Sequence, residues 1–282
     1  MNFDFNIKKL TNIDYIVGII GAIIFFLILK KAIIIPITHD EVSTVNYFSK
    51  MSIWDIITYK DPIPNNHILN TLLIKLFATI GGYKTFIVRL PSILSFLLLY
   101  FFIVKIVRTY INDKFLIVSS IIFFVFNSYF IDFYSLARGY GLSIAFEMGS
   151  VYYFLNFINK SRNKDLIYSL IFGSLSVYSN FTTLNFYLPL ILLLFIIIIT
   201  NKNIDKLLIK SQLLILFLIP LIFFSIIIYP ISRMMKNDQI NVWGSTGFYN
   251  ETIKVLINSM KLNVQYFDLS NDSIALIVVC VI

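Results

Sequence analysis

The chain has 282 residues, of which 58% are hydrophobic and 13% charged, and its formal net charge is +8. A soluble domain has about 25% charged residues, so this composition excludes a soluble fold. Apolar runs of about 20 residues, long enough for a helical crossing of a bilayer, recur without strict alternation, which excludes a β-barrel. The predicted class is an all-α, polytopic membrane helical bundle.

The basic residues do not indicate a nucleic-acid partner, because they lie in short loops between apolar runs, where they act as topology signals. Cys280 is the single cysteine, so neither a disulfide nor a thiolate metal site is expected. The first apolar run is too long for the core of a signal peptide and lacks a cleavage site. We therefore expect it to remain as a membrane anchor.

Seven clear spans follow one another along the chain, and an eighth begins near Ser273. The seven cover residues 14–37, 88–107, 115–131, 139–158, 166–178, 183–200 and 207–229. The sequence ends after about half of the eighth span, so we expect further C-terminal helices in the complete protein. Residues 1–282 are predicted to belong to a single transmembrane domain.

Residues 68–80 are apolar, but a run this short is more typical of an interfacial or re-entrant segment, and it contains Lys75. If this segment does not cross, three short basic loops and the N-terminus share one side, which the positive-inside rule makes cytoplasmic. If it does cross, the N-terminus lies opposite those loops. The loops contain Lys105, Arg108 and Lys114; Lys160, Arg162 and Lys164; and Lys202, Lys206 and Lys210.

Without a crossing at residues 68–80, the first outer loop is 38–87 and the second large one is 230–272. Residues 42–60 have the pattern of an amphipathic surface helix, and the segment that begins at Asn66 can dip into the outer leaflet. This layout can form a cavity open to both lipid and water. The second loop either covers that cavity or is a plain connector.

Four short motifs occur in the order found in the C-type (GT-C) glycosyltransferase superfamily, over roughly residues 10–200. They are His39-Asp40-Glu41, Asn66-His67 before an apolar helix, Arg89-Leu90-Pro91-Ser92, and Ala137-Arg138-Gly139-Tyr140. The chain resembles the protein O-mannosyltransferase and aminoarabinose transferase branches. This resemblance implies a polyprenyl-phosphate sugar donor and an acidic residue in the first outer loop. The family's His-Pro-Pro turn is replaced here by Asn65-Asn66-His67.

The acidic pair Asp40 and Glu41 is the predicted catalytic centre. Glycosyl transfer needs a base that takes the proton of the acceptor hydroxyl. The resemblance implies that Asp40 is this base and that Glu41 supports the site. The alternative is an acidic loop or a helix N-cap. His39 either orients Asp40 and binds substrate or is a neutral interfacial histidine.

Five further residues are predicted to bind substrate. Asn66 and His67 either line the cavity or cap the next helix. Arg138 can hold the donor phosphate through two parallel hydrogen bonds, or it can be an interface anchor. Arg89 presents the same choice, since anchoring its own helix also explains it. Tyr140 belongs to the same motif as Arg138.

Glu147 lies inside the fourth predicted span, where a carboxylate is costly and usually faces a cavity or a partner. It either lines the donor site or forms a structural ion pair.

The predicted function is an inverting membrane glycosyltransferase that uses a polyprenyl-phosphate sugar and a lipid, glycan or protein acceptor. No cofactor is indicated, although a carboxylate pair could recruit a divalent cation. We expect a multi-pass protein of the plasma or inner membrane, with a cytoplasmic N-terminus and an outer active site. A transporter or flippase of lipid-linked sugars and a non-catalytic scaffold are the alternatives.

Overall fold

The computed structural model describes residues 11–201, 206–239, 247 and 249–254. These segments contain helices and no strand, which confirms the all-α prediction. The chain divides into two compact units, residues 1–239 and 240–282. Of the second unit, the short π-helix Tyr249–Ile253 (η3) is described, whereas the predicted eighth span lies outside the described residues.

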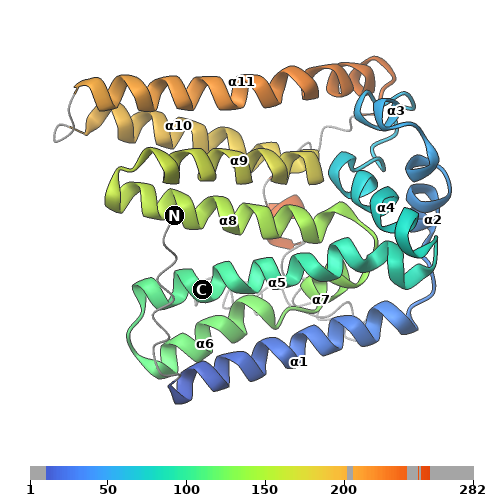
Figure 1. Cartoon of the computed structure of the whole chain (residues 1–282), viewed down its shortest axis with the longest axis horizontal. Helices are drawn as coiled ribbons and strands as arrows, with labels where there is room; N and C mark the ends of the chain where they lie inside the picture. The colour runs from blue at the N-terminus through green and yellow to red at the C-terminus, as the bar shows by residue number, and fades with distance from the viewer. Residues whose placement is uncertain (1–10, 202–205, 240–246, 248, 255–282) are drawn as a thin grey trace. The chain divides into compact units, whose positions relative to one another are not determined.

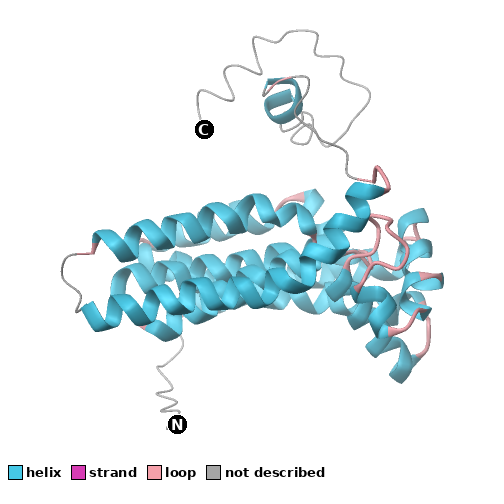
Figure 2. Cartoon of the chain, turned by 90° about the horizontal axis from the view of Figure 1, so that it is seen from above, coloured by secondary structure: helices cyan, strands magenta, loops and turns pink. Residues whose placement is uncertain are grey.

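The long helices of the first unit run side by side as a bundle (Figures 1 and 2). They are α1 (Asn12–Ile34), α5 (Thr85–Tyr110), α6 (Lys114–Val125), α7 (Ser128–Ser135), α8 (Gly139–Lys160), α9 (Asn163–Ser179), α10 (Leu184–Thr200) and α11 (Lys206–Lys236). Of the described helices, four are long and apolar enough to cross a membrane, namely α1, α5, α11 and the stretch Phe181–Thr200 made by the 3-10 turn η2 (Phe181–Thr183) with α10. The chain is thus an integral membrane protein.

Helices α8 and α9 were predicted as spans but are not among these four. They lie inside the bundle between α5 and α10 (Figure 1). Small polar residues join them: the Ser150 hydroxyl donates to the Ser169 carbonyl (2.7 Å), and the Ser169 hydroxyl donates back to the Ser150 carbonyl (3.1 Å). Both helices bury several small residues, among them Gly149 and Ser150 on α8 and Ser169 and Gly173 on α9, and α9 has only 17 residues.

The predicted span 115–131 is not one continuous helix. It is the pair α6 and α7, bent by 57° at the break between them. The break occurs at Asn127, whose side chain accepts a hydrogen bond from the Tyr129 N–H (2.9 Å) and so starts α7. Taken together, the pair makes a fifth candidate span among the described helices.

The basic helix ends gather at one end of the bundle. The α5–α6 and α8–α9 connections, the end of α10 and the start of α11 lie at the left in Figure 1, as does the start of α1. The helices α2 (His39–Asn46), α3 (Ile53–Ile57) and α4 (Ile68–Gly81) lie at the other end. This grouping is the one expected if residues 68–80 do not cross the membrane.

The side chain of Lys75 ties α4 to the first loop at this end of the bundle. Its ammonium group donates to the carbonyls of Ser49 (3.1 Å) and Met51 (2.9 Å). These carbonyls close the 3-10 helix Phe48–Lys50 (η1) of the first loop. The charged group of this apolar helix therefore binds the backbone of the first loop. Helix α4 itself is short and apolar, with 14 residues.

The single amphipathic helix predicted for residues 42–60 is also wrong. The segment forms α2, η1 and α3 in succession. The first helix starts earlier, because Thr38 caps it, and the third starts anew at Ser52, whose hydroxyl accepts from the Asp55 N–H (3.0 Å). The apolar face survives the breaks: Val45 and Ile56 are buried.

The second outer loop begins later than predicted, because α11 continues to Lys236. Residues 230–236 are therefore helical. The Arg233 guanidinium at this end donates to the Lys60 carbonyl (2.9 Å) and so joins α11 to the first outer loop. Most of the remaining 237–272 segment lies outside the described residues.

Candidate active site

A buried ion pair joins the first outer loop to the bundle. Arg89 on α5 donates from Nε to one oxygen of Glu41 on α2 (2.7 Å) and from Nη2 to the other (2.6 Å). Both side chains are 0% exposed. Two parallel charge-assisted bonds of this kind fix the relative orientation of both groups.

The other N–H groups of Arg89 go to the end of α1. They donate to the carbonyls of Ala32 (2.8 Å), Ile35 (2.8 Å) and Pro36 (3.1 Å). All five N–H groups of the guanidinium are thereby used. Arg89 has no donor left for a substrate, and its geometry fits the alternative role of an anchor for its helix.

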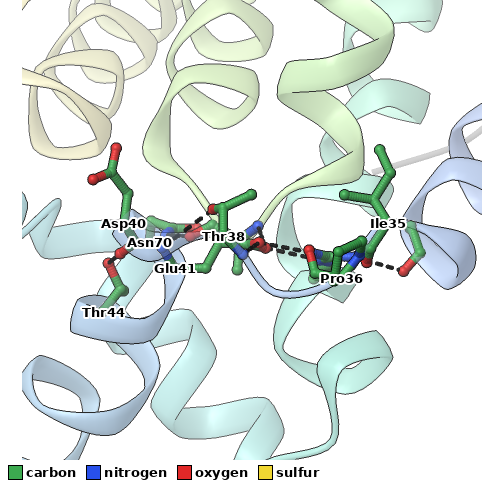
Figure 3. A network of polar contacts seen from close by, with 10 residues as sticks. Ile35, Pro36, Thr38, Asp40, Glu41, Thr44 and Asn70 are labelled. Carbon is green, nitrogen blue, oxygen red and sulfur yellow. Dashed lines mark hydrogen bonds and ion pairs between the residues drawn. The ribbon is translucent and has the colours of Figure 1, made fainter.

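Glu41 is bonded on the remaining sides as well. It accepts from the Thr38 N–H (2.9 Å) as the second half of a capping box and from the Ala137 N–H (2.7 Å). Figure 3 shows this network from Ile35 to Thr44. Burial raises the pKa of Glu41, but the bonds from Arg89, Ala137 and Thr38 outweigh it, so the pKa lies below its ordinary value. Glu41 is thus a structural carboxylate, held ionised and away from any reacting group.

Asp40 points the other way. Successive residues of a helix are about 100° apart, so an inward Glu41 turns its neighbour outward. The Asp40 side chain is 57% exposed, and in Figure 3 its carboxylate points away from Glu41. It lies 3.0 Å from Nη1 of Arg138, and Nδ1 of the exposed His39 lies 3.6 Å from it. The structure thus brings two of the predicted site residues, Asp40 and Arg138, into direct contact.

Arg138 stands immediately before α8 and is 8% exposed. Besides Asp40, its guanidinium contacts the Asn65 side-chain oxygen and the Tyr140 hydroxyl (3.3 Å), and it lies 5.3 Å from the centre of the Tyr140 ring. The Arg138 guanidinium is thus held by α2, by the turn before α4 and by α8, and the Asp40 carboxylate lies at its exposed side.

Asn66 fixes the turn before α4. Its amide donates to the Ile56 carbonyl (2.9 Å), and the Tyr59 hydroxyl donates to the Asn66 carbonyl. The helix cap is His67, whose side chain makes no capping bond, so the predicted capping role of Asn66 is wrong. Its contact with a substrate cavity stays a prediction.

His67 is packed beside the start of α8. Its ring meets the Tyr140 ring edge-on, with 5.2 Å between centres. A Cβ on Gly139 would lie 2.8 Å from the His67 ring and 2.0 Å from the Ser179 carbonyl, so only glycine fits there. Burial, aided by the nearby Arg138 charge, lowers the pKa of His67 to about 3. The imidazole is therefore neutral.

A cavity of about 460 Å³, lined by several polar side chains, begins at Tyr140, which also contacts Arg138. One wall is a single face of α8, and the other is the corner between α9 and α10. Its lining comprises Tyr140, Ser143, Ile144, Glu147, Asn180, Thr182, Thr183, Asn185 and Phe186. A cavity was one of the two alternatives predicted for Glu147, and Tyr140 was predicted to bind substrate. The residues from 180 to 186 were missed, and the only available signal was a short polar break between two apolar runs.

No group of three or more histidine, cysteine, aspartate or glutamate side chains that could hold a metal ion occurs among the described residues. Whether the reaction needs a cofactor or a divalent cation stays a prediction.

Fold and site together define an integral membrane protein that gathers a carboxylate, a guanidinium and a polar cavity at one end of its helices. A family model described as dolichyl-phosphate-mannose-protein mannosyltransferase matches residues 65–248, more than half of the chain. The chain belongs to this family and is a membrane glycosyltransferase of the mannosyltransferase type. No curated protein and no solved structure matches it. Arg138 and Glu147 lie within the matched residues, whereas Asp40 precedes them.

The buried pair yields a stability prediction. Removing Glu41 by Glu41→Ala leaves the Arg89 charge buried and uncompensated, which costs about 3–5 kcal/mol of folding free energy. Thermal unfolding of the purified protein in detergent measures this loss. The matched control is Asp55→Asn in the exposed pair with Lys60, where about 0–1 kcal/mol is expected. Equal shifts for the two variants would show that the pair does not hold the loop.

His67 yields a pH prediction. The neutral folded form binds no proton until the pH approaches about 3, whereas the unfolded histidine titrates near its ordinary value of 6.5. Stability from this group is therefore complete above about pH 6.5 and falls as the pH drops below it. Melting temperatures at pH 7.5 and 5 should differ more for the wild type than for His67→Gln. An identical pH dependence in the two proteins contradicts the burial of a neutral imidazole.

Proposed function

We propose that this protein transfers a sugar from a polyprenyl-phosphate donor to an acceptor hydroxyl on the non-cytoplasmic face, with Asp40 as the general base. The observation that carries the proposal is the 3.0 Å contact between Asp40 and Arg138 beside a polar cavity. At this distance a base can act on the attacking hydroxyl while an anion-binding group holds the leaving phosphate of the same displacement reaction.

Arg138 is proposed to hold the donor phosphate. A guanidinium matches two phosphate oxygens with parallel hydrogen bonds. Its burial supports the role, because electrostatic interactions are stronger where water is excluded. As the sugar leaves, negative charge grows on the lipid phosphate, and a preplaced cation stabilises that charge in the transition state.

Asp40 is proposed to become free as the donor binds. In the structure the Asp40 carboxylate forms an ion pair with the Arg138 guanidinium. A phosphate that binds this guanidinium competes with the carboxylate for it. The displaced carboxylate can then accept a proton from the acceptor hydroxyl. The acceptor oxygen forms a bond to the anomeric carbon from the face opposite the phosphate, the carbon–oxygen bond to the phosphate breaks with its electron pair, and the configuration inverts.

The bundle supports a lipid-linked donor. A lipid tail can lie beside the apolar helices in the bilayer. Asp40 and Arg138, at the start of α2 and just before α8, lie at one end of these helices, where a polar head group can reach them. The sequence has no glycine-rich phosphate loop and no Asp-x-Asp motif, which a soluble transferase uses for a nucleotide sugar. The acceptor is a hydroxyl of a lipid, glycan or protein.

The proposed outer placement of the site rests on charge. Basic residues concentrate at the opposite end of the bundle, and positively charged short loops stay in the cytoplasm.

The base assignment is tested by Asp40→Asn, which keeps the shape of the side chain but cannot take a proton. We expect transfer from a polyprenyl-phosphate sugar to fall by about 10²–10⁴-fold, with kcat affected more than KM. Asp55→Asn, a carboxylate of the same outer loop, should keep wild-type activity. Unchanged transfer by a folded Asp40→Asn protein removes the base from the mechanism.

The side of the membrane is tested separately. His39 is almost fully exposed beside Asp40, so His39→Cys in a Cys280→Ser background gives a single accessible thiol. A membrane-impermeant maleimide added to intact cells should label it. A matched Lys164→Cys variant, at the basic end, should react only after the membrane is permeabilised. The reverse pattern would place the site in the cytoplasm.

A further inference from the structure

One face of α8 carries a stripe that leads from Arg138 into the bundle. Tyr140, Ser143, Ile144 and Glu147 follow the spacing that puts residues on one side of a helix, and all four line the cavity. Tyr140 also lies under the Arg138 guanidinium. The cavity therefore begins where the proposed phosphate site ends.

Glu147 is the acidic group of this cavity, and it has no ion-pair or hydrogen-bond partner among the described residues. The other carboxylates within the described helices of the bundle are paired: Asp14 with Arg108, Asp132 with Lys31, and Asp165 with Arg162. An unpaired carboxyl inside apolar helices is costly, and it usually faces a cavity or a ligand. Here it faces the cavity.

The opposite wall supplies complementary groups. The Asn180 side-chain oxygen accepts from the Thr182 N–H (3.2 Å), which leaves its amide N–H groups as donors. On this wall the Thr183 hydroxyl donates to the Asn180 carbonyl (2.8 Å), and on the α8 wall the Ser143 hydroxyl donates to the Tyr140 carbonyl (2.8 Å), so both hydroxyl oxygens remain acceptors. Asn185 is exposed, and its amide offers both a hydrogen-bond acceptor and hydrogen-bond donors.

Mixed donors and acceptors beside aromatic rings suit a ring that carries several hydroxyl groups, since each hydroxyl both donates and accepts. A divalent metal ion would need more than one carboxylate to match its charge, and an apolar ligand would leave the amides unpaired. The cavity volume of about 460 Å³ is within the range of small-molecule sites.

We propose that this cavity binds the sugar ring of the lipid-linked donor and that Glu147 is a specificity-determining residue, accepting hydrogen bonds from the ring hydroxyls. The assignment rests on the proposed function, because it takes the phosphate to be at Arg138. Asn180 and Asn185 donate to the ring from the other wall, and Tyr140 and Phe186 cover its apolar faces.

The test compares two probes on purified protein in nanodiscs: undecaprenyl phosphate and undecaprenyl-phosphate mannose. Glu147→Gln should weaken binding of the sugar-bearing lipid by about tenfold, since a hydrogen bond to a charged group is lost, and should leave the bare lipid phosphate unchanged. Asp132→Asn, a carboxylate of α7 that does not line the cavity, should change neither affinity. Arg138→Gln should weaken both probes.

The outcomes separate the two proposals. If the wild type binds and uses the mannose-bearing lipid and folded Glu147→Gln protein keeps its affinity for it, the sugar assignment fails and the proposed function stands. If the wild type shows no binding of either probe and no transfer, the proposed function fails. If Glu147→Gln does not fold, Asn185→Ala is used in its place, because the exposed Asn185 side chain is not needed for packing. We expect this variant to lose about three- to tenfold in affinity for the sugar-bearing lipid and none for the bare lipid phosphate.

Discussion

The buried ion pair between Arg89 and Glu41 is the interaction on which the rest of the site depends. Its bonds reach the end of α1, the start of α2, the start of α5 and the residue before Arg138. Two charges removed from water are stable only when all their hydrogen-bonding groups are satisfied, so these elements must meet at one point. The segment 38–87, whose helices are mostly short, is thereby fixed against the bundle.

The same constraint sets the geometry of the reacting groups. Holding Glu41 inward directs Asp40 outward, and fixing the Ala137 backbone places Arg138 beside it. The two adjacent acidic residues therefore have separate tasks, one structural and one proposed to be catalytic. A buried neutral His67 and a glycine at position 139 complete the close packing that brings Tyr140 to the mouth of the cavity.

The sequence by itself determined the class, most of the long helices and the end of the bundle where the polar residues meet, because hydropathy and the positions of basic loops are properties of the chain. It also indicated that Asp40, Arg138 and Tyr140 belong together. It did not predict the breaks at Asn127 and within residues 42–60, because capping by a single polar side chain competes only weakly with helix propensity.

Only the tertiary structure decided which polar residues are used up in bonds within the protein and which remain accessible. Arg89 and Arg138 carry the same side chain near the same end of the bundle. Arg89 has every N–H group bonded to Glu41 or to backbone carbonyls, whereas Arg138 contacts the exposed Asp40 carboxylate and the ring of Tyr140, which lines the cavity. Adjacent carboxylates at positions 40 and 41 differ in the same way. These distinctions, and the cavity residues near Asn180, arise from contacts between segments far apart in the chain, and local pattern contains no information about such contacts.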